Sequence, residues 1–137
     1  MILIDTGFWL ALANRGDRAH GKAVAALNRY REPFVTTWPV LTETCHLLAS
    51  RLGYDAELTF MRSAVAGAFE IFALAPSHLS RIEALMVKYR NLPMDLADAS
   101  LVIAAEELGS GRILSTDQRD FGAYRWKSRK PFKNLLL

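Results

Sequence analysis

Cysteine is almost absent from this sequence. Cys45 is the single thiol, so no disulfide can form within the chain, and we expect a reducing, cytoplasmic setting. No uninterrupted apolar run reaches the roughly 18 residues that a membrane span needs. The first residues, Met1 to Asp5, have no basic segment ahead of the apolar ones, as a secretory signal would. These absences argue against secreted disulfide scaffolds and membrane proteins.

Several common catalytic and metal-binding signatures are missing as well. Cys45 and the three histidines show no zinc-ligand spacing, and no glycine-rich phosphate loop or Ser–His pairing stands out. Repeats, low-complexity tracts and long linkers are also absent. The chain has 137 residues, and 51% of them are hydrophobic. That suffices for one domain with a real core, so we expect a single domain over residues 1–137.

Positive charge is concentrated near the end of the sequence. Between Arg112 and Lys133 lie seven basic and two acidic residues, so this basic segment carries +5 while the whole chain carries +3. A basic region on a mildly acidic body suggests a polyanionic partner such as a nucleic acid. A solvated surface that aids solubility would explain the same charges.

Hydrophobic spacing predicts strands that alternate with helices. A continuous apolar run, Ile2 to Ile4, is typical of a strand buried on both faces. This alternation predicts an α/β fold, a three-layer α/β/α sandwich around a mainly parallel sheet. The expected strands are 2–4, 34–36, 69–74, 112–115 and 132–136; the expected helices are 8–13, 18–30, 39–53, 56–68, one capped by Ser77 and ending near 90, and 95–108, which stops at Gly109.

Two acidic residues follow predicted strands. Asp5 comes directly after the first strand, and Asp117 follows the strand that begins at Arg112. The carboxyl ends of parallel strands share one edge of a sheet, where ligands bind in such folds, so both acids are expected there. Asp5 could instead cap the next helix, as could Thr6, and Asp117 could be a turn residue.

Two further acids lie on predicted helices. Asp98 shares a helical stripe with Leu101, Val102 and Ala105, and a buried carboxylate needs a cation, a metal or a raised pKa. The alternative is a cap in which Asp95 is the N-cap residue and Asp98 lies in the first turn. Glu43 borders the buried face of its helix, where the helix dipole alone could also account for it.

The order strand-Asp, helix-Glu, helix-Asp, strand-Asp suits a divalent cation. Hard cations take oxygen ligands, and Mg²⁺ is held by a few carboxylates together with water and phosphate. Four clustered carboxylates would repel one another without a cation. One or two metals would make the cluster favourable and could cleave a phosphodiester while the basic segment holds the backbone.

These residues resemble the PIN domains, specifically VapC-type toxins of bacterial and archaeal toxin–antitoxin pairs. The matching stretches are Ile2 to Thr6, Leu41 to Glu43, Leu96 to Leu101 and Leu114 to Phe121. The resemblance implies a PIN fold and a Mg²⁺- or Mn²⁺-dependent endoribonuclease. It also implies a small VapB-type antitoxin partner and a homodimer. The sequence does not identify which RNA would be cut.

Carried over by position, the resemblance gives Asp5 and Asp98 as principal metal ligands, Glu43 as the third acid and Asp117 as a more variable fourth. Asp120 and Asp95 compete for an acidic role. Gly7 departs from the pattern, because many relatives have serine there. Contacts to the substrate are expected from Thr6, Thr116, Arg119, Arg125 and Lys127.

Three alternatives remain to be weighed. A haloacid-dehalogenase-like phosphatase would need a second Asp where Gly7 stands, and a receiver domain would need paired acids at the end of the first strand. Neither pattern occurs. The third is a PIN-like module that binds RNA or protein without cutting, against which four retained acids argue. For an antitoxin, the apolar helix around Trp9 is the expected docking surface.

Overall fold

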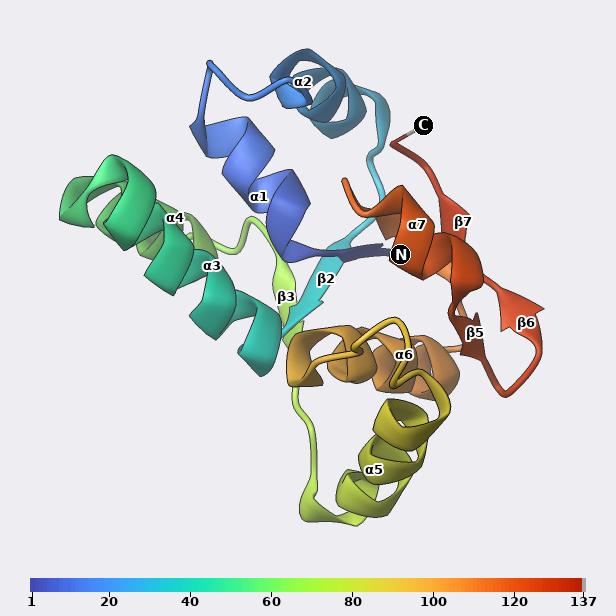
Figure 1. The fold of residues 1–137 in the computed structure, drawn as a ribbon. Helices are drawn as coiled ribbons and strands as arrows, with labels where there is room; N and C mark the ends of the chain where they lie inside the picture. Colours follow the sequence, from blue (N-terminus) through green and yellow to red (C-terminus); the bar gives the residue numbers. More distant parts are fainter. Residues whose placement is uncertain (137) are drawn as a thin grey trace.

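The computed structural model describes residues 1–136, and a parallel sheet organises them (Figure 1). Its five strands run in the order β3-β2-β1-β4-β7, and every pairing is parallel. β1 is central and pairs with β2 through Ile2 and Phe34 and with β4 through Leu3 and Ile113. The strands are β1 (Ile2–Ile4), β2 (Phe34–Thr37), β3 (Glu70–Phe72), β4 (Arg112–Leu114) and β7 (Lys133–Asn134).

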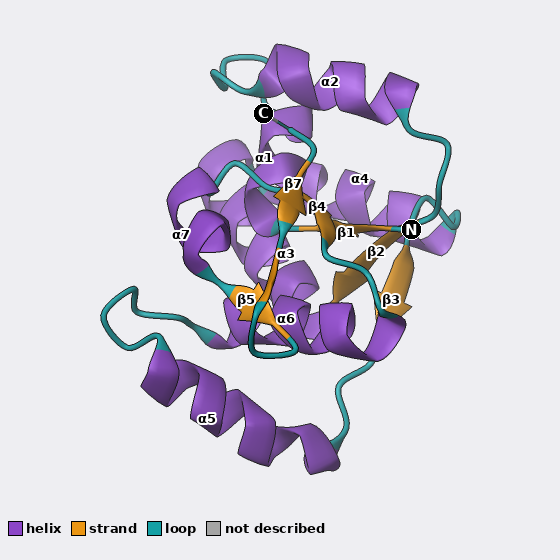
Figure 2. Ribbon diagram, turned by 90° about the vertical axis from the view of Figure 1, so that its right-hand side faces the viewer, coloured by secondary structure: helices purple, strands orange, loops and turns teal. Residues whose placement is uncertain are grey.

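Helices flank this sheet and complete the predicted α/β sandwich. In Figure 1, α3 and α4 lie together on one side of β2 and β3, while α5 and α6 lie together below these strands. Figure 2 shows the same strands enclosed between helices. The helices are α1 (Thr6–Ala13), α2 (His20–Arg29), α3 (Trp38–Leu52), α4 (Tyr54–Val65), α5 (Leu79–Lys88), α6 (Leu96–Leu108) and α7 (Gln118–Ala123). Within residues 1–136, none of them is long and apolar enough to span a membrane.

Local sequence sets the ends of the helices that border the site. Thr37 caps α3 with its side chain, and Pro39 occupies the first turn, where its missing N–H is not needed. Asp95 caps α6. The same helix ends at Gly109, which adopts a left-handed conformation with φ 72° that a side chain would disfavour.

Several details differ from the sequence-based prediction, among them a shorter third strand, Glu70–Phe72 instead of 69–74, and a first helix that begins at Thr6 instead of residue 8. Ser77 does not cap α5; a 3₁₀ turn over Pro76–His78 precedes this helix, and His78 Nδ1 accepts the N–H of Ala75 instead. The last strand is shorter than predicted, Lys133–Asn134. The sequence also gave no indication of α7 or of the antiparallel hairpin β5 (Arg125–Trp126) and β6 (Lys130–Pro131).

The residue types in the hairpin turn explain why the sequence did not predict the hairpin. Lys127 and Ser128 have φ of 48° and 69°. Such conformations are usually marked by Gly or Asn, and neither residue occurs in this turn. Packing of Trp126 holds the hairpin against the body of the protein. This side chain is 9% exposed, and its Nε1 donates to the carbonyl of Pro131 at 3.1 Å.

Replacement of Gly111 tests this packing. A Cβ built on Gly111 would overlap the indole of Trp126, with Cδ1 at 2.9 Å. We expect Gly111→Ala to destabilise the protein by about 1–3 kcal/mol, as overpacking does. The matched control is Gly122→Ala in α7, where a Cβ meets no atom within 4 Å; alanine should be neutral or stabilising there. Urea denaturation measures both, and wild-type stability in Gly111→Ala would contradict the position of Trp126.

Candidate metal site at the sheet edge

Asp5 and Asp117 lie at the carboxyl edge of the sheet because β1 and β4 are parallel neighbours. The N–H of Asp5 donates to the carbonyl of Leu114 at 3.2 Å, so the pairing of the two strands extends to the acid itself. Asp117 lies three residues beyond the end of β4 and caps α7 by accepting the N–H of Asp120 at 3.0 Å. Both acids therefore cap helices, as the alternative had suggested for Asp5 but not for Asp117, which was expected in a turn, and both also face the same edge.

Asp5 is held at both carboxylate oxygens. Oδ1 accepts the N–H of Thr6 at 2.7 Å, and Oδ2 accepts the hydroxyl of Ser115 at 2.9 Å. Ser115 Oγ in turn accepts the N–H of Asp117 at 2.9 Å. Ser115 is fully buried and thereby links the two acids. Sequence reasoning missed it, although its position directly after β4 was a signal.

Asp98 lies in the first turn of α6 and is half-buried. Its backbone N–H donates to Asp95 Oδ1 at 2.8 Å, whereas its own Oδ2 accepts the N–H of Asp95 at a long 3.4 Å. The stronger partner of Oδ2 is the hydroxyl of Tyr124 at 3.1 Å. The capping alternative thus accounts fully for Asp95 and only partly for Asp98. Nothing in the sequence indicated Tyr124.

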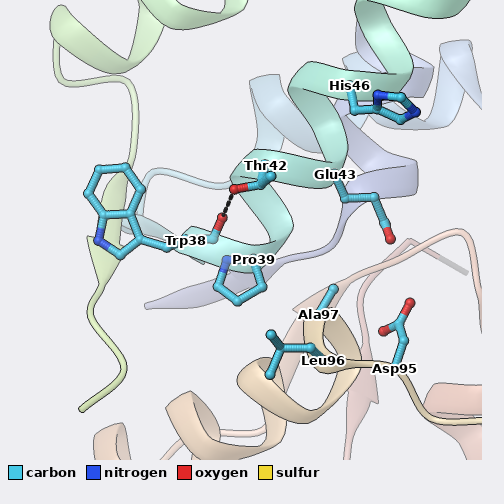
Figure 3. Close-up of a pocket in the computed structure, with 8 residues that line it drawn as sticks. All are labelled: Trp38, Pro39, Thr42, Glu43, His46, Asp95, Leu96 and Ala97. Atoms are coloured by element: carbon cyan, nitrogen blue, oxygen red, sulfur yellow. Dashed lines mark hydrogen bonds between the residues drawn. The ribbon is translucent and has the colours of Figure 1, made fainter. Parts of the chain in front are cut away.

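Glu43 lines a surface pocket beside these acids (Figure 3). The pocket measures about 580 Å³ and lies between the first turns of α3 and the start of α6. Trp38, 53% exposed, lies at one end of the labelled residues, while Glu43 and Asp95 lie at the other. Leu96 and Ala97 face Pro39 across the gap. Asp5, Asp98 and Asp117 do not line this pocket, so Glu43 is the acid shared by the pocket and the sheet edge.

The pKa shifts place Asp5 at the centre of the acidic group. The pKa of Asp5 is raised to about 6, by burial first and then by the charges of Glu43 and Asp117, while the hydrogen bonds from Thr6 and Ser115 lower it in part. The pKa of Asp98 is raised to about 8, by burial first and then by the charges of Asp95 and Asp5. The pKa of Asp117 is also raised, by burial first. The charges of Glu43 and Asp117 thus raise the pKa of Asp5, and the charge of Asp5 in turn raises the pKa of Asp98.

Asp120 forms an ion pair with its neighbour Arg119. Its Oδ1 accepts from Arg119 Nε at 3.1 Å, which partly neutralises it. Asp117 has no such basic partner among residues 1–136 at salt-bridge distance. Of the two competing acids, Asp117 is the one that faces Asp5.

The four carboxylates supply the oxygen ligands that a hard divalent cation prefers. In the described part of the chain, no three His, Cys, Asp or Glu side chains already enclose a point where an ion would sit. Mg²⁺ keeps several waters and needs only one or two direct carboxylates, so an open arrangement suits it better than a closed cage. Asp5, Asp98, Glu43 and Asp117 offer oxygen ligands, and the pKa values of three of them are raised by burial first and by neighbouring negative charge second, both of which a bound cation would offset.

The residues expected to touch substrate have different surroundings. Thr6 is buried, and its Oγ1 has no partner within residues 1–136. Thr116 is exposed and lies against Gly7, so closely that a Cβ at residue 7 would overlap the Thr116 hydroxyl. The absence of serine at this position therefore goes together with a threonine hydroxyl in the same space.

The three basic candidates are not equally free. The side chain of Arg119 is 78% exposed. Arg125 turns its Nη1 onto the carbonyls of Gly122, Ala123 and Tyr124, and so closes the end of α7. Lys127 extends over the Trp126 ring, with Nζ 5.8 Å from its centroid, and Lys130 does the same at 4.9 Å. Arg119 and the two lysines are thus more available to a phosphate backbone than Arg125.

Comparison with known proteins gives consistent matches. Over 124 residues, 90% of this chain and 92% of the relative, the sequence is 28% identical to the ribonuclease VapC26 of Mycobacterium tuberculosis. Over 56 residues, 41% of this chain and 43% of the relative, it is 43% identical to the 23S rRNA-specific endonuclease VapC20 of the same species. The crystal structure of M. tuberculosis VapC20, described as a toxin that cleaves the sarcin-ricin loop, superposes with a TM-score of 0.81 at 23% identity, covering 87% of this chain and 92% of that one.

A family model provides the broadest match. Residues 2–127 match the model described as PIN domain, which spans the sheet edge and all four acids. The fold agrees with this match, because the superposed structure is a VapC toxin with the same α/β architecture. This chain therefore belongs to the PIN-domain family.

Proposed function

We propose that this protein is a metal-dependent endoribonuclease of the VapC type, the toxin component of a toxin–antitoxin pair. RNA is the proposed substrate because the similar proteins carry the names ribonuclease and 23S rRNA-specific endonuclease. Residues 1–137 would form one PIN domain, and the lone, buried thiol of Cys45 fits a cytoplasmic location.

One observation carries this proposal. Asp5 and Asp98 are buried or half-buried carboxylates, and their hydrogen-bond partners within residues 1–136 are hydroxyls and backbone N–H groups, none of them cationic. A buried negative charge without a positive partner is costly. A divalent cation would remove this cost, which a module that only binds RNA or protein would have no reason to maintain.

The residues have distinct proposed roles. Asp5 and Asp98 would hold Mg²⁺ or Mn²⁺, with Glu43 and Asp117 bound directly or through water. When bound, such a cation activates a water molecule for attack and stabilises charge on the phosphate. Thr6 and Thr116 would contact the substrate beside Asp5, and Arg119, Arg125 and Lys127 would hold its backbone.

We propose two protein partners, an antitoxin and a second copy of this chain. A VapB-type antitoxin is proposed to dock beside Trp9, where a surface groove of about 440 Å³ is lined by apolar residues of α1, α2, α3 and α4. The groove suits the apolar face of a helix. A homodimer is proposed on the opposite region, because α5 exposes Leu79, Met86 and Val87, which are 64%, 37% and 60% exposed.

Neutralising a ligand should abolish cleavage. We expect Asp5→Asn and Asp98→Asn each to lower kcat/KM for RNA cleavage at least ~100-fold, because even losing a partner of a ligand costs about 10–100-fold. Asp55→Asn on the exposed first turn of α4 is the matched control and should keep wild-type activity. Circular dichroism checks the fold of each variant. Cleavage at the wild-type rate by Asp98→Asn would refute the assignment.

Metal and pH should change stability in a defined direction. The pKa values of Asp5 and Asp98 are raised above 3.8, to about 6 and about 8, so the folded state binds protons more tightly than the unfolded state. Stability of the metal-free protein should therefore fall as pH rises from about 4 to about 8, and level off beyond.

Millimolar Mg²⁺ should restore much of this loss at pH 8 by binding the folded state alone. Asp98→Asn should flatten the pH dependence and remove most of the Mg²⁺ effect. Thermal melts between pH 5 and 9, with Mg²⁺ or with EDTA, measure both effects. A wild-type melting temperature that responds neither to pH nor to Mg²⁺ would argue against the acidic group.

The basic segment should contribute affinity without base preference. We expect the double variant Arg119→Ala, Lys130→Ala to weaken RNA binding. The slope of the logarithm of the binding constant against the logarithm of salt concentration should become shallower by about 0.7 for each lost phosphate contact. Lys22→Ala with Arg62→Ala removes the same charge from exposed positions on α2 and α4 and serves as control. Fluorescence anisotropy at several salt concentrations distinguishes the two. Equal losses in both variants would point to net charge rather than to this segment.

A further inference from the structure

Tyr124 is a fully buried tyrosine whose ring is fixed by aromatic neighbours. It follows α7 as the C-cap residue and is 0% exposed. Phe121 and Tyr89 pack against it edge to face, with ring centroids 5.2 and 5.0 Å away. Its backbone N–H is bonded to the carbonyl of Asp120 at 2.8 Å. The position of the hydroxyl is therefore set by the core rather than by solvent.

This hydroxyl has one proton and two acceptors within reach. Asp98 Oδ2 lies 3.1 Å away and the carbonyl oxygen of Leu92 lies 3.4 Å away. The carboxyl oxygen is the closer of the two acceptors, and in the ionised form of Asp98, which binds a cation, it is also the stronger one, because bonds to charged acceptors are shorter and stronger. Tyr124 therefore donates to Asp98.

The bond leaves Asp98 asymmetric. Both hydrogen bonds that its carboxylate accepts within residues 1–136 reach Oδ2: the one from Tyr124, and the long one of 3.4 Å from the N–H of Asp95. Asp5 differs, because each of its oxygens has a close donor. With Oδ2 anchored, Oδ1 of Asp98 is the oxygen left to bind an ion.

The placement of Tyr124 also ties it to a second acid. The short helix α7 has Asp117 as its N-cap and Tyr124 as its C-cap. One end thus places a candidate ligand beside Asp5, while the other end reaches Asp98 on α6. In Figure 1, α7 lies beside β7 and above β5 and β6.

We propose that Tyr124 is a positioning residue for the metal site: its hydroxyl holds Asp98 Oδ2 so that Oδ1 is presented to the divalent cation. This inference rests on the proposed function, because it takes Asp98 to be a ligand. It adds a residue that the ligand set does not contain, and it makes α7 part of the site at both of its ends.

The variant Tyr124→Phe removes the hydroxyl oxygen alone and keeps the aromatic packing. We expect the dissociation constant for Mn²⁺, measured by calorimetry, to rise about 10–100-fold, the range seen when a partner of a ligand is lost. The Mn²⁺ concentration for half-maximal RNA cleavage should rise by the same factor. The cleavage rate at saturating Mn²⁺ should change much less, because the ligand itself remains.

Tyr89→Phe is the matched control. Tyr89 is also a buried tyrosine of this cluster, and its hydroxyl accepts the N–H of Arg125 at 3.0 Å without touching a carboxylate. Its loss should leave Mn²⁺ affinity within about twofold of wild type, because this hydroxyl shares no partner with a proposed ligand. Equal weakening in both variants would mean that general packing is responsible, and wild-type affinity in Tyr124→Phe would overturn the inference directly.

A metal-free measurement covers the case in which Tyr124→Phe folds poorly. In a double-mutant cycle with Asp98→Ala, the melting temperature should fall less on loss of the hydroxyl when Asp98 is already gone. Additive effects would overturn the inference. If the wild type itself binds no Mn²⁺, the proposed function fails together with this inference. If the wild type binds Mn²⁺ and Tyr124→Phe binds it equally well, the proposed function stands and the role of Tyr124 is refuted.

Discussion

The bridge made by Ser115 is the interaction on which the candidate site depends. Its hydroxyl donates to Asp5 and accepts from the backbone of Asp117, so one buried side chain fixes two acids that are 112 residues apart in sequence. The bridge exists because β1 and β4 are parallel neighbours whose carboxyl ends coincide. Helix α6 then brings Asp98 to the same place, and α3 brings Glu43 to its border. The sheet determines the site, and the helices complete it.

This arrangement sets stability against activity. Burial and mutual repulsion raise the pKa values of Asp5 and Asp98, which means that their ionised forms are disfavoured in the fold. A protein selected for stability alone would replace or neutralise them. The fold tolerates them because hydrogen bonds from Ser115, Tyr124 and backbone N–H groups stabilise the charged forms in part. The proposed cation would supply the remaining stabilisation of the negative charge.

The sequence predicted the parts of this architecture that depend on local pattern. The alternation of apolar strands such as Ile2 to Ile4 with helices predicted the parallel sheet, and the helical spacing that ends at Gly109 predicted α6. Ser115 and Tyr124 could not be assigned, because their roles depend on partners 110 and 26 residues away. The hairpin after α7 was missed for a different reason: its positive φ values occur at Lys127 and Ser128, whose residue types do not indicate them.

The contact between Gly7 and Thr116 has an evolutionary consequence. A Cβ at residue 7 would overlap the Thr116 hydroxyl and lie 3.1 Å from its Cβ, so a side chain at residue 7 requires residue 116 to rotate or to become smaller. Along any lineage of similar chains, a change from glycine to serine at the first position should be accompanied by a smaller residue at the second. The pair would then conserve one hydroxyl beside the first strand while exchanging which segment supplies it. Covariation, rather than conservation of either residue, is the signature that this site would leave in an alignment.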